Sequence, residues 1–338
     1  AGLSRPFSGK LADKIGRKPV MIFGASVCFA VGLSYPLLHF VSGFLFLRFA
    51  HGFSAGFTPT GTSAYVADTV PFAQRGEAMG IQSLFGSLGM AAGPALGGWI
   101  ASFWPIETLF YAAAFTAIFS ILILVRLKET LPQKEPFRLR LFKLDKNEIL
   151  EKRVLLPSTI LFLSVFSFGV VLTLIPDLSS FLGIKNKGLF FAVFTLSSLG
   201  IRLIAGRTSD RIGRVKVMRV ASSVMIVAMI AVAFAASKVM LLGSAVLFGA
   251  AVGMYSPTTT AWVVDRSLEN YRGRALATMY IFLELGIGLG ALVSSWLYNN
   301  KPENFQIAFL FSAGMAFLGF LILTFVKSDQ KNSTELVA

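Results

Sequence analysis

Ionisable side chains inside long apolar stretches are the residues of this chain most suited to chemistry. Glu284 lies in the stretch 277–298, roughly 14 Å from its charged end at 1.5 Å per helical residue. Arg48 lies in the stretch 42–66, and His51 follows it by one helical turn. A charged group in lipid is costly and usually faces a cavity or a polar partner. These three residues are therefore candidates for binding a proton or a small substrate.

Each candidate has a simpler interpretation as well. Glu284 could be the structural partner of a neighbouring polar group, Arg48 could extend to the outer surface, and His51 could be a polar packing residue. The single cysteine, Cys28, and two histidines do not make a metal site. We expect no metal and no cofactor, with a proton gradient as the energy source. The pattern Gly-x-x-x-x-Gly-Lys-[Ser/Thr] is absent from the sequence, which argues against an ATP-driven pump or another enzyme.

The stretches that hold these residues are long enough to cross a membrane. Of 338 residues, 55% are hydrophobic and 14% charged, with a mean hydropathy of +0.71, whereas soluble domains average about 25% charged residues. A span needs about 20 mostly apolar residues and must be helical, because lipid offers the backbone no partners. We predict spans at 19–38, 42–66, 79–101, 107–126, 154–176, 188–206, 217–236, 240–264, 277–298 and 304–326.

The placement of the cations predicts orientation rather than nucleic-acid binding, despite a net charge of +14. One alternating set of loops holds only Lys185, Lys187, Lys238 and Lys301, and Arg48 lies inside a span. The rest of the 31 cations fall in the other set of loops. By the positive-inside rule, that second set faces the cytoplasm.

Two charged segments repeat at a fixed distance. The first is Gly9-Lys-Leu-Ala-Asp13-Lys-Ile-Gly16-Arg17-Lys18, and the second is Gly206-Arg-Thr-Ser-Asp210-Arg-Ile-Gly213-Arg214. We read both as short loops, 197 residues apart. Further matches at this offset are Arg5 with Arg202, Gly52 with Gly249, Gly56 with Gly253, Asp68 with Asp265, Arg75 with Arg272, Gly76 with Gly273, and Gly93 with Gly290.

The repeat predicts an all-α polytopic membrane protein with two pseudo-symmetric six-helix halves. Spans 154–176 and most of 188–206 have no upstream counterpart, so we expect twelve helices in the intact protein, with two more before residue 1. Residues 1–8 would be the end of a helix. We assign 1–126 to the N-terminal half, 127–153 to a solvated cytoplasmic linker, 154–326 to the C-terminal half and 327–338 to a cytoplasmic tail. In this architecture the substrate binds near the midplane between halves that rock against each other.

In its repeats and in the motifs below, the chain resembles the major facilitator superfamily. Gly9-x-Leu11-Ala12-Asp13-x-x-Gly16-Arg17-Lys18 is similar to the family's signature segment between its second and third helices. Arg48-x-x-x-Gly52-x-x-x-Gly56 resembles the fourth-helix motif of the drug:proton antiporter branch. Gly89-x-x-x-Gly93-Pro94-x-x-Gly97-Gly98 resembles that branch's fifth-helix motif, and Asp68 with Arg75-Gly76 resembles the segment after helix four.

The resemblance implies a cytoplasmic gate that favours the outward-facing state. Asp13 can accept hydrogen bonds from the N-terminus of a neighbouring helix, while Arg17 offers a planar fork to carboxylates such as Asp68. Asp210, Arg214 and Asp265 would form the matching set. The alternative is that these charges only anchor topology. The gate candidates are Gly9, Asp13, Gly16, Arg17, Asp68, Arg75, Gly206, Asp210, Gly213, Arg214, Asp265 and Arg272.

The glycines of the fifth-helix motif form a small-residue face, which lets helices approach closely. Pro94 can kink that helix. A bent, closely packed helix suits a hinge of an exporter, although ordinary close packing would also explain the pattern. The motif residues are Gly89, Gly93, Pro94, Gly97 and Gly98.

We therefore predict a secondary active exporter that moves a drug or metabolite outward against proton entry, with Glu284 and Arg48 coupling the two. The expected partners are the bilayer, protons and a small-molecule substrate, with no nucleic acid and a monomeric state. The expected location is a bacterial inner or plasma membrane. Two alternatives stay open: a symporter or facilitator for uptake of sugars or other metabolites, and a non-transporting membrane sensor or scaffold.

Overall fold

The computed structural model describes residues 2–38, 40–184 and 186–326. Inside helices, it does not describe the side chains of Met90, Ala91, Pro94, Ala95, Gly98, Ser102, Lys146 and Asn147. Across the described residues the chain forms helices and no strand. The predicted all-α fold is therefore confirmed.

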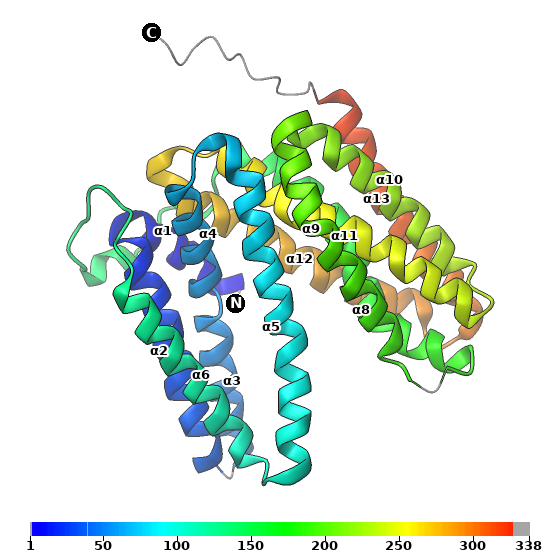
Figure 1. The fold of residues 1–338 in the computed structure, drawn as a ribbon, viewed down its shortest axis with the longest axis horizontal. Helices are drawn as coiled ribbons and strands as arrows, with labels where there is room; N and C mark the ends of the chain where they lie inside the picture. Colours follow the sequence, from blue (N-terminus) through cyan, green and yellow to red (C-terminus); the bar gives the residue numbers. More distant parts are fainter. Residues whose placement is uncertain (1, 39, 185, 327–338) are drawn as a thin grey trace. The chain divides into compact units, whose positions relative to one another are not determined.

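The α-helices of the described chain are α1 (Arg5–Lys14), α2 (Arg17–Ser34), α3 (Val41–Ser54), α4 (Phe57–Thr69), α5 (Arg75–Phe103), α6 (Glu107–Arg126), α7 (Lys146–Ile149), α8 (Leu155–Phe181), α9 (Leu189–Ile212), α10 (Arg214–Ala233), α11 (Lys238–Arg266), α12 (Arg272–Tyr298) and α13 (Phe305–Phe325) (Figure 1). Short 3-10 helices occupy Gly2–Ser4, Tyr35–Leu37, Phe72–Gln74, Leu139–Phe142, Lys152–Val154, Glu269–Tyr271 and Pro302–Asn304.

Eight of the described helices are long and apolar enough to cross a membrane. Their ranges are Arg17–Leu37, Glu107–Arg126, Lys152–Phe181, Leu189–Ile212, Arg214–Ala233, Lys238–Arg266, Glu269–Tyr298 and Pro302–Phe325. Each corresponds to a predicted span, and α6 has the predicted bounds. The predicted span 79–101 corresponds to α5, which extends further at both ends.

The predicted single span 42–66 is broken into α3 and α4 around Ala55 and Gly56. Pro59 explains the break, because proline lacks the N–H that would bond the carbonyl four residues earlier, and its ring crowds that carbonyl. In a continuous helix, residue 59 would donate to the carbonyl of Ala55, and proline cannot make this bond. The carbonyl of Gly56 instead accepts from the side chains of Thr60, at 3.0 Å, and Arg5, at 3.0 Å.

The two charged segments are largely helical rather than loops, which corrects the sequence-based prediction. α1 continues through Lys14, and α2 begins at Arg17, so only two residues separate them. α9 likewise continues through Ile212. Each interruption contains a glycine with a positive φ, +120° at Gly16 and +98° at Gly213. Only glycine adopts such angles without a steric penalty.

The chain divides into two compact units that are each discontinuous in sequence. Unit 1 contains Ala1–Pro71, Phe85–Leu155 and Val263–Ile281, and unit 2 contains Phe72–Leu84, Leu156–Trp262 and Phe282–Ala338. The first turns of α5 therefore belong to unit 2, whereas the first turns of α12 belong to unit 1. Each unit includes the start of a helix from the other sequence repeat. The boundaries at 126, 153 and 326 predicted from the sequence stay predictions.

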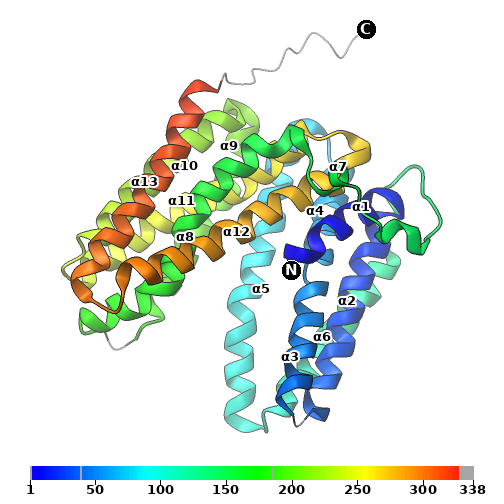
Figure 2. The same ribbon diagram turned by 180° about the vertical axis from the view of Figure 1, so that it is seen from behind.

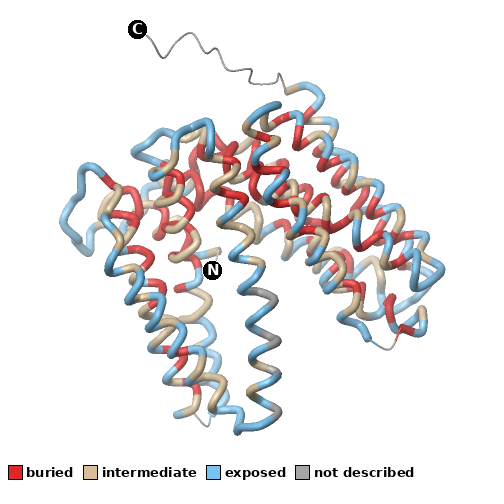
Figure 3. Tube along the Cα trace, viewed as in Figure 1, coloured by how far each residue is buried: buried red, intermediate tan, exposed pale blue. Residues whose placement is uncertain are grey.

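Helix packing within each unit buries the apolar faces. In unit 1, α2 lies along α6 and α4, and in unit 2, α10 lies along α13 (Figures 1 and 2). The larger core is in unit 2, where many residues of α8, α10 and α11 are buried (Figure 3). α8 and α12 approach closely there, since a Cβ at Gly286 would lie 2.7 Å from the carbonyl oxygen of Phe162. The α8 backbone lies against Gly290 as well, whereas a Cβ at Gly288 would meet no described atom within 4 Å.

Candidate functional site: two polar clusters at helix N-termini

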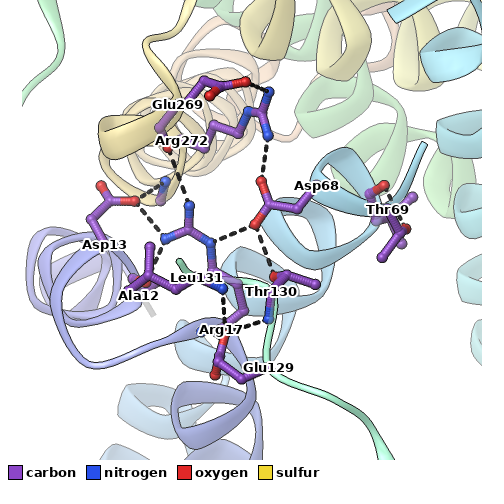
Figure 4. A network of polar contacts seen from close by, with 12 residues as sticks. Ala12, Asp13, Arg17, Asp68, Thr69, Glu129, Thr130, Leu131, Glu269 and Arg272 are labelled. Carbon is purple, nitrogen blue, oxygen red and sulfur yellow. Dashed lines mark hydrogen bonds and ion pairs between the residues drawn. The ribbon is translucent and has the colours of Figure 1, made fainter. Parts of the chain in front are cut away.

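The first polar cluster lies in unit 1 and consists of Asp13, Arg17, Asp68 and Arg272 with the start of α12 (Figure 4). Asp13, in the last turn of α1, accepts hydrogen bonds from the backbone amides of Gly273 at 2.7 Å and Arg274 at 2.8 Å. These amides are free of helical partners at the N-terminus of α12 and carry its positive dipole end. Asp13 therefore caps a helix that comes from the other repeat.

Arg17 connects this cap to Asp68. Its guanidinium lies 2.9 Å from the Asp13 carboxylate and 3.1 Å from the Asp68 carboxylate. Asp68 also pairs with Arg272 and accepts from the hydroxyl of Thr130 at 2.9 Å. The Arg17 side chain is only 1% exposed, so both of its carboxylate partners are needed to offset the cost of burying the charge.

Burial is also the main influence on the protonation of Asp13. It raises the pKa of this carboxyl from 3.8 to about 6, although Arg17 and the two amides of α12 act in the opposite direction. Asp13 consequently titrates closer to neutral pH than an ordinary aspartate does.

The second polar cluster lies in unit 2 and consists of Asp210 and Arg214 with the start of α5. Asp210, in the last turns of α9, accepts from the backbone amides of Gly76 and Glu77, each at 2.9 Å. Arg214 lies 2.6 Å from the Asp210 carboxylate and 2.6 Å from the hydroxyl of Ser209. The arrangement repeats that of Asp13 and Arg17, with the partner helix again taken from the other repeat.

Glycine pairs allow the helices to cross at both clusters. A Cβ at Gly273 would lie 2.6 Å from the carbonyl oxygen of Gly9, and a Cβ at Gly76 would lie 2.5 Å from that of Gly206. Distances this short leave no room for a methyl group. The four glycines that the 197-residue offset relates in sequence thus form two contacts, each of which joins different repeats.

Two further gate candidates, Arg75 and Asp265, lie at helix ends. Arg75 lies at the start of α5 in unit 2, with its guanidinium 5.2 Å from the ring centre of Phe72. The carboxylate of Asp68 is in unit 1, where it pairs with Arg272, the residue that the 197-residue offset relates to Arg75. Asp265 lies in the last turn of α11, in unit 1, whereas Asp210 and Arg214 are in unit 2. The role of Asp265 stays a prediction.

The candidates within spans are placed on α3 and α12. Arg48 is exposed, and no described residue forms an ion pair or hydrogen bond with it. His51 is half-buried, and its Nδ1 lies 3.5 Å from the hydroxyl of Tyr35. Glu284 is half-buried on the unit 2 part of α12, two residues before the close contact at Gly286. Their assigned roles in proton coupling stay predictions.

The fifth-helix motif is only partly described. A Cβ at Gly89 or Gly93 would meet no described atom within 4 Å, and one at Gly97 would lie 3.7 Å from Leu109. The expected close packing along this face is therefore not found among the described residues. The side chain of Pro94 and the position of Gly98 lie outside them.

Two buried arginines were missed as site residues, although the 197-residue offset had related them. Arg5 lies under the first cluster, with its guanidinium 4.2 Å from the ring centre of Tyr280. In unit 2, Arg202 donates to the Ser83 carbonyl at 3.3 Å and the Ser256 hydroxyl at 3.1 Å. Each arginine thus contacts a helix of the other repeat, one to two turns from the cluster in its unit.

Comparison with known proteins agrees with this architecture. The chain matches the family model described as Major Facilitator Superfamily over residues 1–236 and 157–337. It is 30% identical over 314 residues to the multi-drug resistance efflux pump PmrA of Streptococcus pneumoniae, covering 87% of this chain and 75% of that protein. It is 28% identical over 330 residues to the multidrug resistance protein MdtG of Klebsiella pneumoniae, covering 93% of this chain and 78% of that protein.

Solved structures share the fold at lower identity. The human organic anion transporter MFSD10 superposes with a TM-score of 0.82 at 21% identity, covering 95% of this chain and 80% of the other. A double-Trp mutant of XylE superposes with a TM-score of 0.76 at 16% identity, covering 97% and 85%. The repeat, the apolar helices and the family match lead to one conclusion: this chain is an integral membrane transporter, not an enzyme, and belongs to the major facilitator superfamily.

Proposed function

We propose that this protein exports small amphipathic or polar molecules across a bacterial inner or plasma membrane, driven by proton entry. The observation that carries the proposal is the pair of polar clusters. Each holds the N-terminus of a helix from one repeat against the signature segment of the other. Similarity to proteins named as multidrug resistance proteins and efflux pumps supports the outward direction.

In this mechanism the clusters are the cytoplasmic gate. While Asp13 caps α12 and Asp210 caps α5, the cytoplasmic ends of the two repeats are held together, which favours the outward-facing state. Inward opening requires the four amide hydrogen bonds to break and the glycine contacts to separate. The N- and C-terminal ends would both be cytoplasmic, and the functional unit would be a monomer in the lipid bilayer.

Proton coupling is assigned to Glu284, with Arg48 in a supporting role. A carboxylate within a span is costly unless it has a partner or reaches a cavity. Release of substrate would then be linked to protonation of Glu284 from the outer side, because both events would change the charge of the same site. Nothing beyond a bound proton is needed as a cofactor.

The test uses vesicles that contain the full-length protein and carry an imposed proton gradient. We expect gradient-dependent movement of at least one solute from a broad panel of cationic and neutral drugs. Glu284→Gln should abolish the dependence on the gradient. Glu303→Gln, which changes an exposed acid in the segment before α13, should leave it intact. Absence of gradient-dependent flux for the whole panel would rule the proposal out.

A further inference from the structure

The linker (127–153) contacts all four basic residues of the first signature segment, two at the ammonium group and two at the backbone amide. The ammonium of Lys10 lies 2.7 Å from Glu148, and that of Lys14 lies 2.7 Å from Glu135. The backbone amides of Arg17 and Lys18 both donate to Glu129, and the Lys18 ammonium donates to the carbonyl of Val125, just before the linker, at 2.7 Å. The linker was expected to be solvated. Its acidic side chains instead neutralise the segment that forms the first cluster.

Glu129 has the most contacts of these acids. Its carboxylate accepts from the amides of Arg17 at 2.9 Å and Lys18 at 3.1 Å, which are the first two of α2. It also accepts from its own neighbours Thr130 and Leu131, at 2.9 and 3.0 Å. Gly16, the residue before α2, has no side chain that could cap the helix. Glu129 therefore supplies from the linker the cap that the helix lacks.

The position of Gly16 shows how closely the linker approaches. A Cβ at this residue would lie 2.7 Å from the carboxyl carbon of Glu129. A side chain at residue 16 and the cap at residue 129 therefore exclude each other. Beside this cap, Thr130 donates to Asp68 and Leu131 is buried, so the linker is part of the cluster's packing.

The far end of the linker contacts the other repeat. Glu151, only 7% exposed at its side chain, pairs with Arg274 at the start of α12. Its backbone amide donates to the hydroxyl of Thr278 at 2.9 Å, one turn further along α12. The linker thus contacts α2 through Glu129 and α12 through Glu151. Both helices belong to the first cluster, α2 through Arg17 and α12 through the amides that Asp13 caps.

We propose that the linker is a strap that holds the first cluster closed, with Glu129 as its positioning residue. Glu129 fixes the start of α2, and through it the Arg17 guanidinium between Asp13 and Asp68. Glu151 fixes the start of α12, where Asp13 binds. This inference rests on the proposed function, since it assumes that the cluster is a gate.

The second repeat has no equivalent carboxylate. At the 197-residue offset Glu129 corresponds to Val326, so sequence alone places an apolar residue where the first repeat has its cap. Among the described residues the contacts of the strap lie at the first cluster, and a gate that opens as a whole would transmit their effect to the second.

Hydrogen exchange of the full-length protein in lipid nanodiscs tests the strap, because the amides that Asp13 and Asp210 bind are exposed only when a cluster opens. We expect Glu129→Gln to speed exchange at Gly273 and Arg274 by roughly tenfold. The amides of Gly76 and Glu77, which the linker does not contact, should also exchange faster. A role limited to local folding would change only the first pair.

Asp145→Asn is the matched control, since Asp145 is a linker acid whose side chain caps only α7. It should leave exchange at all four amides unchanged. Amides of α10, in the core of unit 2, report whether a variant is folded. If Glu129→Gln speeds exchange in α10 as well, that variant is not properly folded. Glu151→Gln then tests the strap in its place, and it should speed exchange at Gly273 and Arg274 by the same factor.

Wild-type exchange at Gly273 and Arg274 in a folded Glu129→Gln variant would overturn the strap. An equal effect of Asp145→Asn would overturn it too. Neither outcome depends on a transported substrate. A failure of the vesicle flux assay would therefore count against the proposed function and leave the exchange result to decide on the strap.

Discussion

The two polar clusters share a backbone arrangement, around which the first cluster has further charged contacts. In both, an aspartate at the end of a helix caps the N-terminus of a helix from the other repeat, beside a glycine–glycine contact. In the first cluster, Asp68, Arg272 and the linker acids add further charged contacts. The comparison indicates that the cap and the crossing are the shared requirement of the two clusters.

The largest effect is expected from Asp68, which tests whether the additional charges matter. Asp68→Asn would leave Arg17 and Arg272, 1% and 8% exposed, each short of one anionic partner. Leaving a buried charge uncompensated costs about 3–5 kcal/mol. Thermal unfolding in detergent should show that loss, whereas Asp177→Asn, at an exposed position of α8, should change little. A neutral effect of Asp68→Asn would mean that the first cluster depends on its cap alone.

The shared backbone arrangement predicts equal sensitivity at the glycine crossings. Gly273→Ala and Gly76→Ala each place a methyl group within 2.6 Å of a carbonyl oxygen, so each should destabilise by about 1–3 kcal/mol. Gly314→Ala, on α13 with open space around it, should be neutral or stabilising. Chemical denaturation measures all three. A large cost at only one of the two crossings would break the equivalence of the clusters.

The first cluster should also respond to pH through Asp13. The folded pKa of about 6 lies above the ordinary value of 3.8, so the folded state takes up a proton first as pH falls. The stability that this proton binding contributes is complete below 3.8 and is lost as pH rises through 6. Between pH 7.5 and 5 the wild type should gain about 1.4 kcal/mol relative to Asp13→Asn. Parallel pH profiles for the two proteins would contradict this pKa.

The smallest effects are expected from the exposed ion pairs of the two units. Lys14 with Glu135 and Arg207 with Glu77 are each 2.7 Å apart but substantially exposed. Surface pairs contribute about 1 kcal/mol or less and are screened by salt. Glu135→Gln and Glu77→Gln should therefore shift the unfolding midpoint slightly at low salt and not at high salt. A larger shift for Glu135→Gln than for Glu129→Gln would contradict the assignment of Glu129 as the main linker contact.

Much of the fold follows from the sequence, because apolar length and the 197-residue offset are local or periodic signals. α6 spans the predicted residues 107–126, and the offset identified Gly9, Gly76, Gly206 and Gly273 before their contacts were known. The offset relates Gly9 to Gly206 and Gly76 to Gly273, but it could not show that Gly9 contacts Gly273 and that Gly76 contacts Gly206. These contacts depend on how the chain folds back in three dimensions.

The break between α3 and α4 and the contacts of the linker were not predicted from the sequence. The break at Ala55 and Gly56 followed from Pro59, but apolar residues on both sides made 42–66 look continuous. The contacts of the linker acids with α1, α2 and α12 join residues more than one hundred positions apart, without a repeat to relate them. The one available clue was the presence of five acids, Glu129, Glu135, Asp145, Glu148 and Glu151, in an otherwise basic linker.

The proposed function requires that both clusters open together as one cytoplasmic gate. The most direct test measures hydrogen exchange at Gly273 and Arg274 in unit 1 after Asp210→Asn in unit 2. Asp210 makes its described contacts in unit 2. If the gate opens as a whole, exchange at Gly273 and Arg274 should rise by roughly tenfold, while α10 stays protected. Unchanged exchange at these two amides, with faster exchange only at Gly76 and Glu77, would show that the clusters open independently and would contradict the account.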